Sequence, residues 1–312
     1  MTRTSLELTL ATFIVALSIA ARSADAKLSV VATTPDFGAI ATAVGGEDAS
    51  VLVLAKPTED PHFVDARPSH IVKLNRADAL IEGGAELEIG WLLPLAEGAR
   101  NPRIAVGAPG RIVASEGIPL LDVPASVDRS KGDVHALGNP HFMLDPVNAR
   151  TVAAHIADAF CRLDAARCAA YRANRDRFTA SVDARLGEWS AALAPFAGAP
   201  VVTYHASWRY FARRFNLRAD TFLEPKPGIP PSPPHLAEVI GKMNAERIKV
   251  ILIEPFQQRK VADAVASRTG SRLAFVGQFP GAFPGTENDY VALMDANVKA
   301  IAAALAAATA AP

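Results

Sequence analysis

Three histidines of this 312-residue chain stand on short loops where they could bind a metal ion. His62 follows the apolar run SVLVLAK in DPHFVDARPS, His141 lies in GNPHFMLDP, and His205 ends the apolar run PVVTYH. Pro61 and Pro140 directly precede the first two, which restricts the backbone there. Three imidazoles that meet from separate loops suit a borderline metal such as zinc. Because they lie far apart in the sequence, unlike zinc-finger ligands, their spacing is equally compatible with three ordinary surface residues.

Strands and helices alternate along the chain, which is typical of parallel α/β sheets. Strands are predicted at 27–34, 49–56 and 78–84, then at 200–205, 217–224, 248–255 and 272–279. Helices are predicted at 35–46, 68–77, 86–99, 148–163, 206–216, 236–247, 257–270 and 290–308. His62 and His205 follow strands, and ligands of such sheets bind beyond the carboxyl ends of the strands.

This repeated order predicts an α/β fold of two lobes, each with a mainly parallel sheet flanked by helices. A long helical run from about 164 to 193 separates them, and it would span more than about 40 Å. We therefore place an N-terminal lobe at 27–163, a rigid linker helix at 164–195 and a C-terminal lobe at 196–312.

Other polar residues are weaker candidates for a place in a metal site. His135 lies shortly before His141 and could approach the same place, and Glu254 ends the strand 248–255. Three carboxylates near the histidine motifs either orient imidazoles or cap helices and turns: Asp60, Asp65 and Asp145. His70 and His155 fall on predicted helices and are expected to be solvated or capping, with Ser69 a candidate N-cap, and His235 is expected to be structural or exposed. Three aromatic residues beside His205 are expected in the core: Trp208, Tyr210 and Phe211.

Composition narrows the class of protein. Lys+Arg 32 balances Asp+Glu 32, which argues against nucleic acid as a partner. The chain is 50% hydrophobic and 21% charged, values of a well-packed globular protein.

Residues 1–26, MTRTSLELTLATFIVALSIAARSADA, have the pattern of a secretory signal peptide, with Arg3 before the apolar stretch 8–20. The alternative is an uncleaved anchor, for which the apolar stretch is short. No cysteine lies at the cleavage site, so we expect a periplasmic protein without a lipid anchor.

Export favours a disulfide between the only two cysteines, Cys161 and Cys168. Within one continuous helix their side chains would lie about two turns apart, too far to bond. A disulfide therefore requires a helix break between them, where Asp164 could cap the next helix.

Five motifs in this order resemble the zinc/manganese-type periplasmic solute-binding proteins of ABC transporters, also called cluster A-I or family 9. They are DPHFVDARPSHIVKLNRADALIEGGAELEIGW, GNPHFMLDPVNA, VTYHASWRYFARRFNL, PKPGIPPSPPHL and VILIEPFQQRKVADAVA, and they cover essentially the whole mature chain. The resemblance implies two lobes linked by a long rigid helix, with the metal in the cleft between them.

Carried over by motif, the resemblance implies His62, His141 and His205 as metal ligands. Histidine at the third position, where many manganese binders have glutamate, points to zinc. The aspartate that often supplies a fourth ligand is missing from LAFVGQFPGAFPG, where Gly277 and Gln278 stand. The fourth position is left to water, His135 or a carboxylate such as Glu224 or Glu254. The chain also lacks the long His/Asp/Glu-rich loop of many zinc importers.

The resemblance implies a monomeric protein that captures Zn²⁺ and delivers it to a membrane permease of an ABC transporter, without catalysis. A Mn²⁺ or Fe²⁺ cargo is one alternative. The other is a secreted zinc hydrolase, but the chain has neither an HExxH nor a G-x-S-x-G motif.

Overall fold

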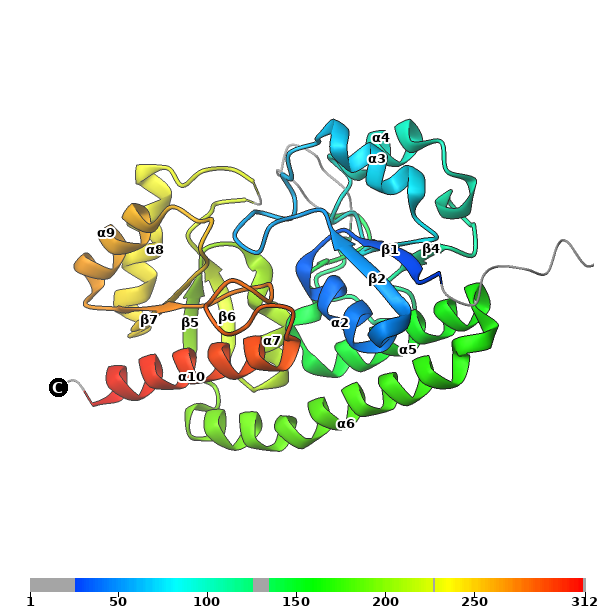
Figure 1. Cartoon of the computed structure of the whole chain (residues 1–312). Coiled ribbons are helices and arrows are strands. Elements are labelled where there is room, and N and C mark those ends of the chain that lie inside the picture. The colour runs from blue at the N-terminus through cyan, green and yellow to red at the C-terminus, as the bar shows by residue number, and fades with distance from the viewer. Residues whose placement is uncertain (1–25, 126–134, 227, 311–312) are drawn as a thin grey trace, which may run out of the picture.

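The computed structural model describes residues 26–125, 135–226 and 228–310, and it folds into two α/β lobes side by side above one long helix (Figure 1). The predicted signal peptide lies almost wholly outside the described residues.

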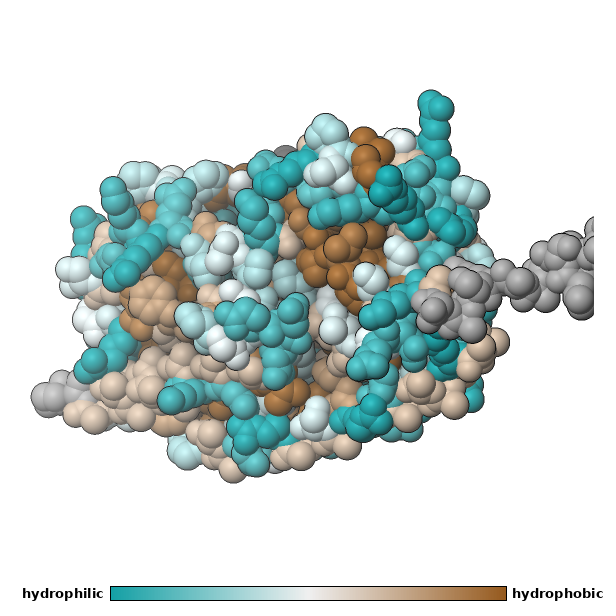
Figure 2. Space-filling view, viewed as in Figure 1, coloured by the Kyte–Doolittle hydropathy of each residue, from teal (hydrophilic) through white to brown (hydrophobic). Residues whose placement is uncertain are grey.

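The N-terminal lobe is built on a four-stranded parallel sheet in the order β2-β1-β3-β4. Its strands are β1 (Leu28–Ala32), β2 (Ala49–Val53), β3 (Ala79–Glu82) and β4 (Arg111–Val113). The connecting helices are α2 (Pro35–Gly45), α3 (Pro68–Arg76) and α4 (Leu92–Ala99). β2 is an edge strand that exposes Leu52, and Figure 2 shows an apolar patch over it.

The C-terminal lobe repeats this plan with a parallel sheet in the order β6-β5-β7-β8. Its strands are β5 (Pro200–Thr203), β6 (Arg218–Phe222), β7 (Val250–Ile253) and β8 (Arg272–Phe275). Its helices are α7 (Arg209–Arg214), α8 (Pro233–Ala245), α9 (Arg259–Thr269) and α10 (Tyr290–Thr309). The predicted fold class, two parallel-sheet lobes with a long connecting helix, is confirmed.

Helix α6 (Cys168–Leu193) runs beneath both lobes, and α2, α5 (Pro146–Leu163) and α10 pack against it. One continuous buried cluster joins the lobes: it extends from Val30 in β1 through Phe178 and Trp189 of α6 to Leu252 in β7. Two smaller apolar clusters cover the other faces of the two sheets. Because α6 belongs to the shared core, it couples the lobes mechanically.

Helix α10 is the one helix in the described part of the chain that is long and apolar enough to cross a membrane. It instead packs against β7, β8 and α6, and Figure 2 shows its alanine-rich outer side as a weakly apolar band. Its Asn297 is fully buried and bonds the backbone of Gly277 through both amide atoms. These contacts are those of a core helix.

The disulfide Cys161–Cys168 is present, and the helix break that it requires separates α5 from α6. The long helix begins at Cys168, later than expected, because residues Ala165–Arg167 form a short 3-10 turn. Asp164 does not cap α6. Its carboxylate pairs with Arg167 at 2.7 Å and accepts a hydrogen bond from Tyr171 Oη at 3.2 Å.

The segment 139–145 contacts both lobes. Three side chains of the C-terminal lobe reach it: Tyr210 Oη donates to the Asn139 carbonyl oxygen at 2.7 Å, Arg214 pairs with Asp145 at 2.7 Å, and Tyr290 Oη donates to the Met143 carbonyl oxygen at 2.6 Å. From the N-terminal lobe, the ring of Phe37 lies 6.3 Å from the ring of Phe142. The segment is therefore pinned between the two lobes.

Several local expectations were wrong. Strand β4 was not predicted, because it has only three residues. Ser69 does not cap α3: the N-cap is Arg67, and Pro68 takes the first helical position. His70 is buried, with 4% of its surface exposed, so it is not a solvated side chain. The three aromatic residues beside His205 are buried as expected.

Candidate metal centre

His62 lies on the loop after β2, and hydrogen bonds fix the backbone around it. Asp60 Oδ1 accepts from the His62 backbone N–H at 2.9 Å, which closes a tight turn. Trp91 Nε1 donates to the Pro61 carbonyl oxygen at 2.9 Å. The polar residues of this loop therefore hold the peptide that carries the imidazole.

His141 and His205 are held in a similar way. Asn139 Oδ1 accepts from the His141 N–H at 3.0 Å, just before the turn that leads into α5. His205 follows β5, and Thr203 Oγ1 donates to its carbonyl oxygen at 2.6 Å. His62 and His205 therefore stand beyond the carboxyl ends of strands in different sheets.

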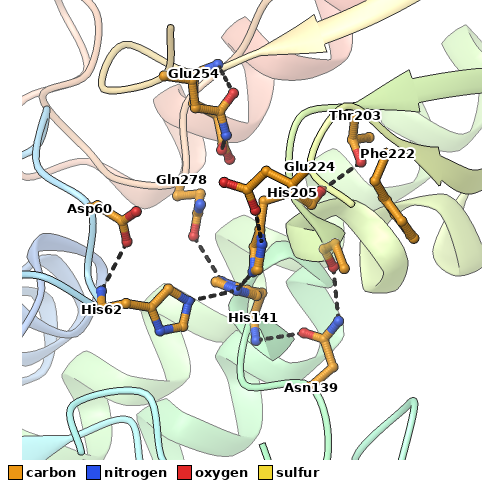
Figure 3. A network of polar contacts seen from close by, with 12 residues as sticks. Asp60, His62, Asn139, His141, Thr203, His205, Phe222, Glu224, Glu254 and Gln278 are labelled. Carbon is orange, nitrogen blue, oxygen red and sulfur yellow. Dashed lines mark hydrogen bonds and ion pairs between the residues drawn. The ribbon is translucent and has the colours of Figure 1, made fainter. Parts of the chain in front are cut away.

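The three imidazoles converge on one point (Figure 3). His141 Nε2 lies 3.2 Å from His62 Nε2 and 3.2 Å from His205 Nε2. One ligand atom from each residue lies within 4.8 Å of the others. Two nitrogens bound tetrahedrally to one zinc ion at about 2.0–2.1 Å would be about 3.4 Å apart. The cluster therefore has the geometry and donor type of a zinc site.

The Nδ1 side of the cluster faces hydrogen-bond acceptors. His205 Nδ1 lies 3.0 Å from Glu224 Oε2, and His141 Nδ1 lies 3.0 Å from Gln278 Oε1. His62 makes a hydrogen bond with the backbone of Leu87. An acceptor at Nδ1 places the proton there and leaves the Nε2 lone pair for a metal.

Burial favours the neutral form of the His62 and His141 imidazoles. Desolvation lowers the pKa of His62 well below its ordinary value, and the His205 and His135 imidazoles lower it further. Desolvation also lowers the pKa of His141, with contributions from His205 and His62. A neutral imidazole is the form that binds a metal, so little proton competition is expected near neutral pH.

The cavity between the three rings is small, about 20 Å³. It holds a single ion or water and is far below the volume of a pocket for an organic ligand. The fully buried Ser207 lines it, and within the described residues its Oγ has no hydrogen-bond partner. A hydroxyl in this position can bond to a group bound on the metal.

His135 and Glu254, two candidates for a fourth metal ligand, lie outside the cluster formed by His62, His141 and His205. His135 stacks on His62, with ring centroids 5.0 Å apart. Glu254 is 2% exposed and accepts from Trp208 Nε1 at 2.9 Å, and in Figure 3 Gln278 lies between it and the histidines. Burial raises the pKa of Glu254 to about 7, partly opposed by hydrogen bonds from Gln278 and Trp208.

The three aspartates also have definite contacts. Asp145 caps α5, where it accepts from the Val147 N–H at 2.9 Å, and Asp65 is exposed near Arg67. Asp60 bonds the backbone of His62 as described above. Sequence reasoning did not foresee the contact of Gln278 with His141, because these residues meet only through the packing of the two lobes.

Solved structures share this architecture. The crystal structure of ZnuA aligns with a TM-score of 0.75 at 23% identity, over 89% of this chain and 99% of that one. FpvC from Pseudomonas aeruginosa in complex with Mn²⁺ aligns with a TM-score of 0.75 at 21% identity, over 90% and 99%. At such identities the likeness establishes the fold. The fold and the histidine cluster together define a protein of two α/β lobes with a candidate metal site between them.

The family model described as ZnuA, zinc-uptake complex component A, periplasmic, matches residues 30–304, and the chain belongs to this family. The zinc-binding protein AdcA of Streptococcus pyogenes serotype M1 is 24% identical over 273 residues, 83% of this chain. The chain spans about half, 52%, of the length of AdcA. The zinc uptake protein ZnuA of Brucella abortus strain 2308 is 27% identical over 132 residues, 42% of this chain and 40% of that protein.

Proposed function

We propose that this protein captures Zn²⁺ with His62, His141 and His205 and delivers it to the membrane permease of an ABC transporter. The convergence of three imidazole nitrogens on a cavity of ionic size carries the proposal. Imidazole nitrogens suit zinc better than the harder Mn²⁺. Membership of the zinc-uptake family supports zinc as the cargo.

The fourth coordination position belongs in this proposal to a water molecule. The Ser207 hydroxyl lines the cavity and, within the described residues, has no hydrogen-bond partner, so it is available to hold this water. A tetrahedral site with three histidines and one water is common for zinc. It also gives the cargo an exchangeable ligand.

The protein acts in this scheme as an exported monomer without a lipid anchor and does no chemistry on the metal. The predicted signal peptide and the absence of cysteine near its cleavage site support export without lipidation. The cavity between the three rings is of ionic size, and the larger pocket beside it, of about 460 Å³, is lined by His205 alone of the three.

The decisive experiment measures competitive zinc affinity of the metal-free protein and of single alanine variants at His62, His141 and His205. Each variant should lose on the order of 100-fold or more, since residues that merely support ligands already cost about 10–100-fold. Mn²⁺ should compete poorly. His155→Ala, on α5 and outside the cluster, is the matched control and should bind as the wild type does.

Undiminished affinity in all three variants would reject the site. Turnover of ester or peptide substrates by the zinc-loaded protein, lost in the same variants, would instead support the hydrolase alternative. Size-exclusion chromatography with light scattering tests whether the protein is a monomer in solution.

A further inference from the structure

A buried chain of polar residues leads away from His141. Glu254 accepts hydrogen bonds from Trp208 Nε1 at 2.9 Å and from Gln257 Nε2. The Gln278 side chain lies between Glu254 and the histidines (Figure 3), and its Oε1 faces His141 Nδ1 at 3.0 Å. Glu254 is 2% exposed and Gln278 is 7% exposed, so water does not substitute for these bonds.

The Gln278 amide determines which groups donate and which accept hydrogen bonds along this series of polar residues. One end of the Gln278 side chain donates and the other accepts. Donors already surround the Glu254 carboxylate, so the Gln278 NH₂ group must face it, and the amide oxygen then faces His141. An amide oxygen only accepts, so His141 must carry its proton on Nδ1. Its Nε2 is left as a lone pair directed at the other histidines.

We propose that Gln278 and Glu254 are positioning residues that fix the Nδ1–H tautomer of His141 and its ring orientation before the metal arrives. This proposal rests on the proposed function, because a fixed His141 tautomer favours zinc capture only where the three histidines bind zinc. His205 and His141 are thus held differently: a carboxylate contacts His205 directly, whereas a neutral amide separates His141 from Glu254. A carboxyl group therefore stands behind each of these two imidazoles without supplying a ligand atom.

The tautomer is measurable without any metal. In ¹⁵N-histidine-labelled, metal-free protein, two-bond ¹H–¹⁵N correlation spectra distinguish Nδ1–H from Nε2–H imidazoles. We expect wild-type His141 as Nδ1–H. Gln278→Leu, which keeps the approximate size and removes the acceptor, should shift His141 toward Nε2–H. Gln278→Glu restores an acceptor and should restore the Nδ1–H tautomer. His205, held by Glu224, is the internal control and should not change.

Zinc affinity supplies the second readout. Gln278→Leu should weaken zinc binding about 10–100-fold, as removal of a group that orients a ligand does. Glu254→Gln, which is isosteric, replaces one of the two acceptor oxygens that face Gln278 by a donor and should give a mixed tautomer and a smaller loss of zinc affinity. It also keeps the test open if Gln278→Leu does not fold.

An unchanged His141 tautomer in both Gln278→Leu and Glu254→Gln overturns the proposal, as does a shifted tautomer with unchanged zinc affinity. Failure of the proposed function is distinguishable, because the tautomer shift in metal-free protein would still occur while alanine variants of the histidines bound zinc normally.

Discussion

Buried carboxyl groups are a recurring feature at the scale of single residues. Glu88 accepts from Thr33 Oγ1 at 2.6 Å and from the Gly83 N–H at 2.7 Å, beside the Leu87 backbone that contacts His62. Burial raises the pKa of Glu88 to about 7. These groups stabilise loops by accepting backbone and hydroxyl hydrogen bonds, and their protonation links the stability of the fold to pH.

Asp36, at the start of α2, allows this link to be measured away from the histidines. Burial raises its pKa from 3.8 to about 6, against the effect of hydrogen bonds from Thr34 and from the Phe37 N–H. Between about pH 4 and 6 the unfolded chain loses this proton while the folded chain keeps it, so stability falls as pH rises and levels off above about pH 6.

Asp36→Asn should therefore gain up to roughly 3 kcal/mol over the wild type as pH rises from about 4 to 6, because each unit of pKa corresponds to about 1.4 kcal/mol. Urea unfolding of both metal-free proteins between pH 4 and 8 measures this difference. A difference that is constant over the whole range would contradict the prediction.

That His62, His141 and His205 come together was predictable from the family resemblance of their motifs, whereas their spacing alone was equally compatible with surface residues. Their Nδ1 partners were not predictable. The contacts of Glu224 with His205 and of Gln278 with His141 depend on how strands that are distant in sequence pair and how the lobes dock.

At the scale of elements, the alternation of strands and helices was strong enough to predict nearly every element, and errors lie at the ends. The run 86–99 forms a helix only from Leu92, since the glycine-flanked residues before it make turns that present Leu87 to His62. The break at Asp164 was predictable from the cysteine spacing, because a disulfide within a continuous helix is geometrically impossible.

Removing this disulfide should affect stability and leave zinc binding intact. Cys161→Ser/Cys168→Ser should lose about 2–3 kcal/mol, the loop-closure entropy of a short loop. The break lies about 25 Å along α5 from the histidine end of that helix. Denaturant unfolding and zinc competition check both expectations, with the reduced wild type as the matched comparison. Weaker zinc binding at unchanged stability would contradict this account.

At the scale of the whole molecule, the shared core predicts that the lobes unfold together. Trp189 of α6 is 2% exposed, and its Nε1 donates to Asp295 of α10 at 2.6 Å. It therefore joins the linker helix to the C-terminal lobe inside the cluster that continues into the N-terminal lobe.

Trp189→Ala should destabilise the protein by about 3–5 kcal/mol through loss of a large buried side chain. Unfolding should remain a single transition by circular dichroism and calorimetry, because both sheets depend on the same cluster. The exposed neighbour variant Glu188→Ala should stay within about 0.5 kcal/mol of the wild type. Two separate transitions in the wild type would show that the lobes are independent.

The segment 139–145, which contacts both lobes, has a mechanical consequence for the cargo. His141 stands on this segment, while His62 and His205 stand on the lobes to either side. If one lobe rotates against the other, the segment acts as a fulcrum and the other two histidines lie on opposite arms. A small rotation then lengthens the gap between His62 and His205 most and moves His141 least. Such a rotation would break the contact of the ion with the histidine of one lobe first. Release of the proposed cargo would then proceed one histidine at a time.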